Sequence, residues 1–206
     1  MVWTGRRRGI YSSWLDCERQ VKGFVGARYK SFRTVEEAKN AFGTTYSDHR
    51  AAAASVGRWA GARTRPIVPS LSVDAACSGS PGRLEYQGVN TATGQRLFHA
   101  GPFADGTNNV GEFLAIADAL RWLVNQDLAW PTYSDSETAI GWVLRGKCNT
   151  KLARTQRNAK LFERIKAAEG ELHHIFANGR AAGKWPRVLK WDTGKWGEIP
   201  ADFGRK

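Results

Sequence analysis

The sequence predicts an α/β protein, in which a small α+β unit precedes a mixed five-stranded sheet flanked by helices. Three observations predict this fold class. Between residues 71 and 101, three segments with strand character follow one another with turns between them. From residue 109 onward, segments with helical spacing alternate with short strand-like segments. Residues 44–69 are rich in Ala, Gly and Arg, end at two prolines, and separate this part from a shorter first unit.

The first unit, residues 1–43, is expected to hold short strands at 2–4, 9–11 and 27–32 and two helices. Ser13 is in the N-cap position of the first helix, with Asp16 or Glu18 in its first turn, and Thr34 caps the second. Residues 44–69 are predicted to form a flexible basic linker, with an ordered extra helix as the alternative.

The second unit, residues 70–206, is expected to hold five strands, at 71–75, 84–89, 95–101, 131–135 and 187–191. A helix opens at residue 109 and places Phe113, Ile116 and Leu120 at helical spacing. Further helices are expected at 136–144, at 158–172 and from residue 199 to the C-terminus. A run of strands followed by strand–helix alternation indicates a mixed sheet with helices on its faces.

The charge of the chain favours a polyanionic partner. Its 206 residues carry 31 Lys and Arg against 19 Asp and Glu, a formal net charge of +12. Each phosphate that a basic protein contacts releases condensed counterions, which favours nucleic-acid binding, and nine tryptophans offer faces for base stacking. The alternative is that the charge serves solubility alone.

Other classes of protein are disfavoured. No apolar stretch approaches the roughly 20 residues of a membrane span, and no apolar region follows the first arginines as in a secretory signal. The three cysteines, Cys17, Cys77 and Cys148, lie far apart, which disfavours a zinc site or a disulfide framework. We therefore expect a cytoplasmic protein that does not bind membranes.

Four carboxylates stand at unusual places. Asp74 lies inside a predicted strand, where burial without a partner costs several kcal/mol. Glu112 lies in the first turn of a helix, Asp135 at a strand end, and Asp202 near the C-terminus. Each has a structural alternative: Glu112 in a capping box, Asp135 as a helix cap, Asp202 at an exposed helix start. If they converge, they need divalent cations, and hard oxygen ligands suit Mg²⁺ or Mn²⁺.

Three motifs in the second unit resemble type 1 ribonuclease H, and they occur in the order found in that family. They are SVDAACSGSPG at 72–82, TNNVGEFLA at 107–115 and YSDS at 133–136. The first unit resembles the RNA–DNA hybrid-binding domain of the same family, a viroplasmin-like domain. Its marks are GIY at 9–11, SWLDC at 13–17 and GARYKSF at 26–32.

The resemblance implies a ribonuclease H-like sheet and an endonuclease that hydrolyses the RNA strand of RNA–DNA hybrids. Catalysis would use two Mg²⁺ ions, with Mn²⁺ as a substitute, and would leave 5′-phosphate products. Asp74, Glu112, Asp135 and Asp202 would be the catalytic, metal-binding carboxylates. Asp192 and Glu198 are the rivals of Asp202, and no His stands in the loop where many family members carry one.

The resemblance also implies substrate contacts. Residues expected at the RNA minor groove are Cys77, Ser78, Gly79, Asn108 and Asn109, with Ser136 beside the third carboxylate. Thr107 and Asn158 are expected to form a pocket for a DNA phosphate. In the hybrid-binding domain, the expected DNA contacts are Trp14, Arg28, Tyr29 and Lys30.

Two other functions stay open at this level. One is a binding protein for hybrids or duplex RNA, with an acidic cluster that serves structure alone. The other is a different nuclease on the same fold, such as a DNA-cleaving resolvase. The complete set of four carboxylates disfavours the first, and the hybrid-binding unit with the Asn108–Asn109 pair disfavours the second. No obligate protein partner is evident, so we expect a monomer.

Overall fold

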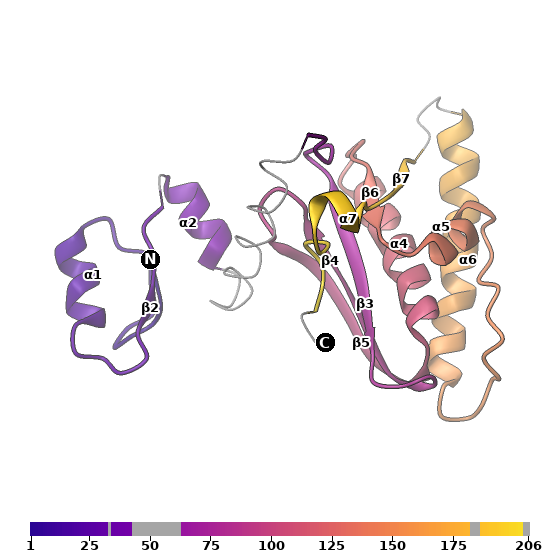
Figure 1. Cartoon of the computed structure of the whole chain (residues 1–206), viewed down its shortest axis with the longest axis horizontal. Helices are drawn as coiled ribbons and strands as arrows, with labels where there is room; N and C mark the ends of the chain where they lie inside the picture. Colours follow the sequence, from indigo (N-terminus) through magenta and orange to yellow (C-terminus); the bar gives the residue numbers. More distant parts are fainter. Residues whose placement is uncertain (33, 43–62, 182–185, 204–206) are drawn as a thin grey trace. The chain divides into compact units, whose positions relative to one another are not determined.

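The computed structural model describes residues 1–32, 34–42, 63–181 and 186–203, which form two units (Figure 1). Most of the predicted linker and the final residues 204–206 lie outside these ranges, so the predicted linker and domain boundaries stay predictions. Each unit is described by itself. No helix within the described ranges combines the length and the apolar character that crossing a membrane requires.

In the first unit, strand β1 (Val2–Thr4) pairs antiparallel with β2 (Arg28–Tyr29). Because side chains alternate along a strand, Val2 packs against helix α1 (Trp14–Val21) while Trp3 packs against helix α2 (Val35–Phe42). Ser13 caps α1 as predicted, since its Oγ accepts the Asp16 N–H at 3.2 Å. The segment expected as a strand at 9–11 makes only an isolated bridge, between Gly9 and Val2.

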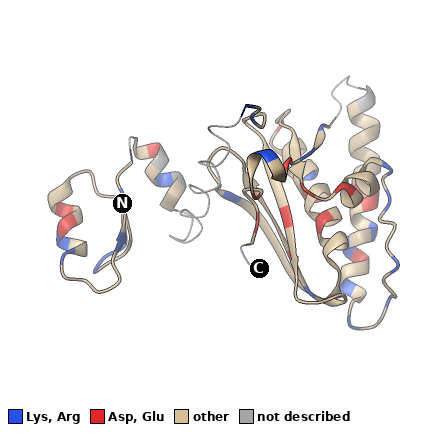
Figure 2. Ribbon diagram, in the orientation of Figure 1, with Lys and Arg blue, Asp and Glu red and all other residues tan. Residues whose placement is uncertain are grey.

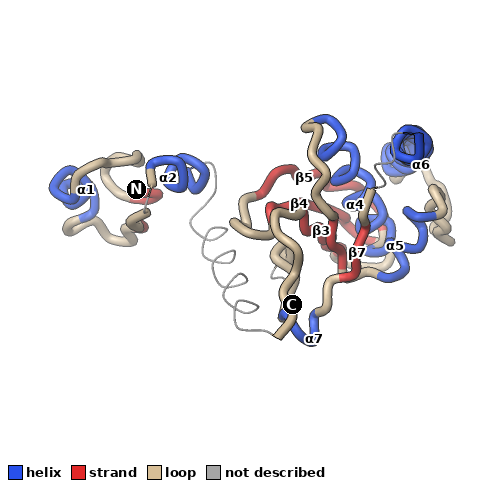
Figure 3. Tube along the Cα trace, turned by 90° about the horizontal axis from the view of Figure 1, so that it is seen from above, coloured by secondary structure: helices blue, strands red, loops and turns tan. Residues whose placement is uncertain are grey.

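The second unit contains the predicted mixed sheet, with strand order β5-β4-β3-β6-β7. The strands are β3 (Leu71–Cys77), β4 (Gly82–Asn90), β5 (Arg96–Gly106), β6 (Thr132–Ser134) and β7 (Val188–Lys190). The first three form an antiparallel meander, whereas β6 and β7 run parallel to β3. Figure 3 shows helices α4 (Asn108–Asn125), α5 (Glu137–Leu144) and α6 (Ala159–Ala181) together on one side of this sheet.

The main core lies between the sheet and α4. Alternate residues of β3 and β4 point toward the helix and are buried: Leu71, Val73, Leu84 and Tyr86. Gly111 in the first turn of α4 makes a close approach possible, because a Cβ there would lie 2.5 Å from Leu84 Cδ1 and 2.7 Å from Ala75 Cβ. The start of α4 therefore lies directly against β3.

The C-terminal region departs from the sequence prediction. The helix expected from residue 199 is not present in the described part of that segment, where residues 199–201 make only a turn. A short helix, α7 (Thr193–Trp196), comes earlier, with Asp192 as its N-cap. The Ile199 carbonyl accepts the Asp202 N–H at 2.9 Å in a single turn, and the Ala201 carbonyl accepts a side-chain hydrogen bond from Gln87 of β4 instead of a helical one.

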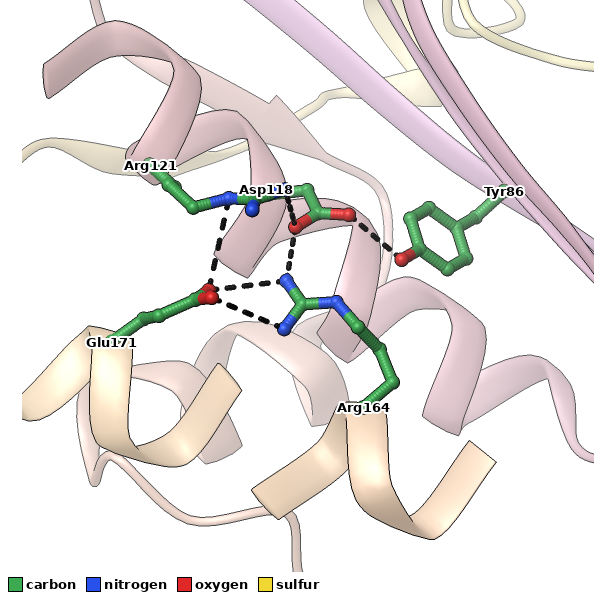
Figure 4. Close-up of polar contacts among 5 residues, drawn as sticks. All are labelled: Tyr86, Asp118, Arg121, Arg164 and Glu171. Carbon is green, nitrogen blue, oxygen red and sulfur yellow. Dashed lines mark hydrogen bonds and ion pairs between the residues drawn. The ribbon is translucent and has the colours of Figure 1, made fainter. Parts of the chain in front are cut away.

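A buried polar network ties β4, α4 and α6 together (Figure 4). Asp118 of α4, 6% exposed, accepts a hydrogen bond from the Tyr86 hydroxyl at 2.7 Å and pairs with Arg164 of α6. Arg164 also donates to Glu171 at 3.1 Å, and the outer Arg121 donates to Asp118 at 2.8 Å. Burial opposes the charge of Arg164, but its carboxylate partners raise its pKa, and burial beside Asp118 raises the pKa of Tyr86.

We predict that Arg164→Ala destabilises the second unit strongly, because it leaves the Asp118 carboxylate buried beside fewer donors. Loss of one partner of a buried pair costs about 3–5 kcal/mol, which corresponds to a fall in Tm of roughly 6–20 °C. Thermal unfolding followed by circular dichroism measures it. Arg121→Ala is the matched control, since its side chain is 48% exposed and such pairs contribute less than about 1 kcal/mol. Equal losses in the two variants would contradict the proposed burial effect.

Candidate functional site

Three carboxylates that are far apart in the sequence meet at one place in the second unit. Asp74 comes from the middle of β3, Glu112 is the fifth residue of α4, and Asp135 directly follows β6. One oxygen from each lies within 4.8 Å of the others. The pairing of β3 with the parallel strand β6 and the close approach of α4 at Gly111 explain why they meet.

Glu112 is the most enclosed of the three, with 2% of its surface exposed. Its Oε1 accepts the main-chain N–H of Ala75 at 3.3 Å and the Asn108 amide at 3.5 Å, and its Oε2 accepts the Ser134 hydroxyl at 3.2 Å. These bonds direct the carboxylate toward the sheet. Glu112 therefore does not complete a capping box at the start of α4, which was the structural alternative for this residue. Helix capping is also excluded for Asp135, because Ser136 is the N-cap of α5, where its Oγ accepts the Ala139 N–H at 3.2 Å.

Burial and neighbouring negative charges raise the pKa values of all three carboxylates. Burial, together with the charges of Asp135 and Asp202, raises the pKa of Asp74 to about 7, although hydrogen bonding to Glu112 opposes the rise. Burial and the neighbouring Asp74 raise the pKa of Glu112 well above its usual range. Burial raises the pKa of Asp135 as well, against the attraction of Lys190. Such a cluster ionises fully only beside a cation, and its hard oxygen donors fit Mg²⁺ or Mn²⁺.

The fourth predicted carboxylate, Asp202, lines the same cavity, and so does its rival Glu198. Asp192 has another role: its Oδ1 accepts the Lys195 N–H at 3.1 Å as the cap of α7, and the Lys195 ammonium lowers its pKa. The backbone at Asp202 is fixed to the sheet through its neighbour, because the Gln87 amide donates to the Ala201 carbonyl at 2.6 Å. Gln87 lies directly opposite Asp74 in the β3–β4 pair.

The cavity above this cluster has a volume of about 1000 Å³. Four of the predicted substrate-contact residues line it: Cys77, Ser78, Asn108 and Ser136. Gly79 lies in the adjoining loop, where its carbonyl accepts the Cys77 thiol at 2.9 Å. Sequence reasoning missed Arg83 and Glu85, which line the same cavity. The alternation of side chains along β4 could have indicated them, because it places Arg83 and Glu85 on the face opposite buried Leu84 and Tyr86.

A second cavity, of about 660 Å³, contains the other predicted contacts, Thr107, Asn109 and Asn158. The Asn158 amide is already engaged, since its Oδ1 accepts the Thr155 N–H at 2.7 Å and its Nδ2 donates to the Ala153 carbonyl at 3.0 Å. Asn158 therefore shapes the wall of this cavity. Figure 2 shows several basic residues along the segment between α5 and α6, which provides much of that wall.

In the first unit, the predicted stacking residues lie at the surface. Trp14 is 60% exposed and Tyr29 is 45% exposed, which excludes the alternative of Trp14 as a core anchor. Their ring centroids lie 5.9 Å apart, and Arg28 and Lys30 flank Tyr29 on the chain. Exposed aromatic faces beside cations are typical of surfaces that bind single nucleic-acid strands.

Comparisons with known proteins found a family model and relatives that this chain resembles. Residues 1–42 match the family model described as Ribonuclease H1 N-terminal domain. A ribonuclease H of Crithidia fasciculata is 64% identical over 39 residues, which are 19% of this chain and 8% of that protein. A ribonuclease H of Saccharomyces cerevisiae is 35% identical over 89 residues, which are 37% of this chain and 26% of that protein. The chain thus spans about a quarter or less of the length of these curated relatives.

Among solved structures, the crystal structure of RNase H1 from the archaeon Halobacterium salinarum is 12% identical, with a TM-score of 0.39. The match covers 64% of this chain and 91% of that one. The family model and the two sequence relatives confirm the resemblance to type 1 ribonuclease H with its N-terminal domain.

The acidic cluster predicts a stability that depends on pH and metal. An acid whose folded pKa is raised stabilises the fold below its unfolded pKa, near 4, and this contribution is lost as pH rises through about 7. The metal-free protein should therefore have a lower Tm at pH 8 than at pH 5. Mg²⁺ at about 100 times its Kd should restore about 2.7 kcal/mol at pH 8, or roughly 5–10 °C.

Differential scanning fluorimetry with and without Mg²⁺, at constant ionic strength, measures this effect. Asp74→Asn is the reference: without metal it should be more stable than the native chain at pH 8, and it should respond weakly to Mg²⁺. A Tm of the native chain that Mg²⁺ leaves unchanged at pH 8 would contradict metal binding at this cluster.

Proposed function

We propose that this protein is an endoribonuclease that hydrolyses the RNA strand of RNA–DNA hybrids and leaves 5′-phosphate products. The observation that carries the proposal is the buried cluster of Asp74, Glu112 and Asp135 at the floor of an open cavity. The match of residues 1–42 to the N-terminal domain of ribonuclease H1 supports the choice of substrate. Two Mg²⁺ ions, replaceable by Mn²⁺, are the proposed cofactors.

In this proposal Asp74, Glu112, Asp135 and Asp202 hold the metal ions. Bound there, the ions would supply an activated water and stabilise the charge on the leaving 3′ oxygen. Ala75 and Ser134 fix the Glu112 carboxylate by hydrogen bonds, and Gln87 fixes the backbone beside Asp202. The carboxylates are thus held in place before substrate arrives, which reduces the cost of reorganisation.

We assign the two cavities to the two strands of a hybrid. Around the first cavity, we assign recognition of the RNA 2′-hydroxyls to Cys77, Ser78, Gly79 and Asn108, with Asn109 adjoining; Ser136 lies beside Asp135. We assign the second cavity to a phosphate of the DNA strand, with Thr107 in its lining and Asn158 holding its wall.

The first unit would bind the DNA strand of the hybrid through Trp14 and Tyr29, with Arg28 and Lys30 near the phosphates. A connection between the two units, which we place at residues 44–69, would raise the effective concentration of substrate at the catalytic unit and favour repeated cutting. We propose that the protein acts as a monomer.

We predict that Asp74→Asn abolishes cutting but retains binding, because it removes a metal ligand and leaves the basic surfaces intact. The loss should be roughly 10³-fold or more. End-labelled RNA–DNA hybrid in Mg²⁺ is the assay, with duplex DNA and duplex RNA as controls and an analysis of the product ends. Asp192→Asn, a cap outside the cavity, should keep most activity. Tight hybrid binding by the native chain without cutting in Mg²⁺ or Mn²⁺ would favour a pure binding protein.

We also predict that Trp14→Ala weakens hybrid binding by the full chain. Stacking of one base on an aromatic ring contributes about 1–3 kcal/mol, which corresponds to roughly 5–150-fold in Kd. Fluorescence anisotropy with labelled hybrid in EDTA measures it, and Trp14→Phe should retain most of the affinity. Because Trp14 is largely exposed, the Tm should hardly change. Unchanged affinity in Trp14→Ala would assign binding to other residues.

A further inference from the structure

One basic residue, Arg83, lines the acidic cavity and has no role in the proposed metal site. Side chains alternate along β4, and Leu84 and Tyr86 point into the core beneath α4. Arg83, two residues before Glu85, therefore lies on the opposite face, the face that carries Asp74. Arg83 is one of the residues that line the cavity containing the three clustered carboxylates.

The charges around Arg83 are otherwise negative. Among the described residues that line this cavity, Arg83 is the only Lys or Arg, against the carboxylates of Asp74, Glu85, Glu112, Asp135, Glu198 and Asp202. Glu85 is paired with His99, whose Nε2 lies 2.9 Å from its Oε2. Within the described part of the chain, the Arg83 guanidinium has no hydrogen bond or ion pair, whereas its main chain is bonded.

The main chain of Arg83 is fixed to the loop that we assign to RNA recognition. The Ser78 N–H donates to the Arg83 carbonyl at 3.0 Å, and the Arg83 N–H donates to Ser78 Oγ at 3.0 Å. Gln87, four residues further along β4, lies opposite Asp74. At about 3.4 Å per residue, Arg83 is displaced along the strand by roughly 14 Å from the level of Asp74.

We propose that Arg83 binds a phosphate of the RNA strand, on a nucleotide next to the site of cleavage and not at the cleaved bond. A guanidinium matches a phosphate through two parallel hydrogen bonds, and an anionic strand that enters an acidic cavity gains most from a cation already placed there. Arg83 is thus a positioning residue for the substrate. This inference rests on the proposed function, because it assumes that the cavity receives the RNA strand.

The first experiment compares Arg83→Gln and Arg83→Lys with Arg187→Gln, which removes the same charge from an exposed residue outside both described cavities. Hybrid binding is measured by anisotropy over a range of salt concentrations in EDTA. Arg83→Gln should weaken binding about 5–20-fold and reduce the slope of log K against log salt by about 0.7–0.9, as for one lost phosphate contact. In Mg²⁺, KM should rise while kcat stays within about twofold, and Arg83→Lys should recover part of the affinity.

The second experiment identifies the strand. Single phosphates near the cleavage site are replaced by neutral methylphosphonates, first in the RNA strand and then in the DNA strand. One RNA position should weaken binding by the native chain but not by Arg83→Gln, because that contact is already lost. The inference would be overturned if a DNA position, and not an RNA position, showed this difference between the native chain and Arg83→Gln. It would also be overturned if no position showed it.

The outcomes separate this inference from the proposed function. If the native chain cuts hybrid but Arg83→Gln behaves like Arg187→Gln, the inference fails and the proposed function stands. If the native chain does not cut, but Arg83→Gln still loses one RNA-phosphate contact, the binding role stands and the nuclease proposal fails. If there is neither cutting nor an effect of Arg83, both fail.

Discussion

The close contact between the first turn of α4 and the sheet is the constraint on which the site depends. Gly111 lies so near to Leu84 and Ala75 that any side chain would collide with them. This contact places the next residue, Glu112, within hydrogen-bonding reach of the β3 backbone at 3.3 Å. Asp74 lies on that strand, and Asp135 follows the strand beside it. The absence of a Cβ at Gly111 therefore allows α4 to lie close enough to the sheet for the acidic cluster to form.

Helix α4 carries two buried carboxylates that the fold treats differently. Asp118 faces a guanidinium and a tyrosine hydroxyl, so its charge is compensated inside the protein (Figure 4). Glu112 receives only neutral donors and faces two further carboxylates, and its pKa rises accordingly. In the first arrangement, loss of one partner would leave an uncompensated charge in the core. The second leaves negative charge without a positive partner, and a divalent cation would compensate it. This difference in compensation separates a structural carboxylate from a candidate metal ligand.

Sequence reasoning succeeded where a local pattern carries the information. The strand periodicity predicted all five strands of the sheet, and Asp74 stood out because an acid inside a strand needs a reason. It failed at the C-terminus, where the expected helix is replaced by a turn anchored through Gln87, a contact between residues 114 positions apart. It also missed Arg83, because this residue is notable only for lining a cavity with six carboxylates, and these come from distant parts of the sequence. Local patterns thus predict elements and suspicious residues, whereas tertiary contacts decide which of them share a site.

The distribution of charge has a consequence for how the substrate would be held. The chain as a whole carries +12, yet the cavity that contains the acidic cluster is lined by six carboxylates and one arginine. Long-range attraction toward a polyanion must therefore come from the basic surfaces outside the cavity, and it weakens as salt screens it. Inside the cavity, attraction depends on bound metal ions and on Arg83. In the proposed function, affinity and catalysis therefore depend on different residues: neutralising the acidic cluster should spare binding, whereas removing basic residues should spare the chemical step.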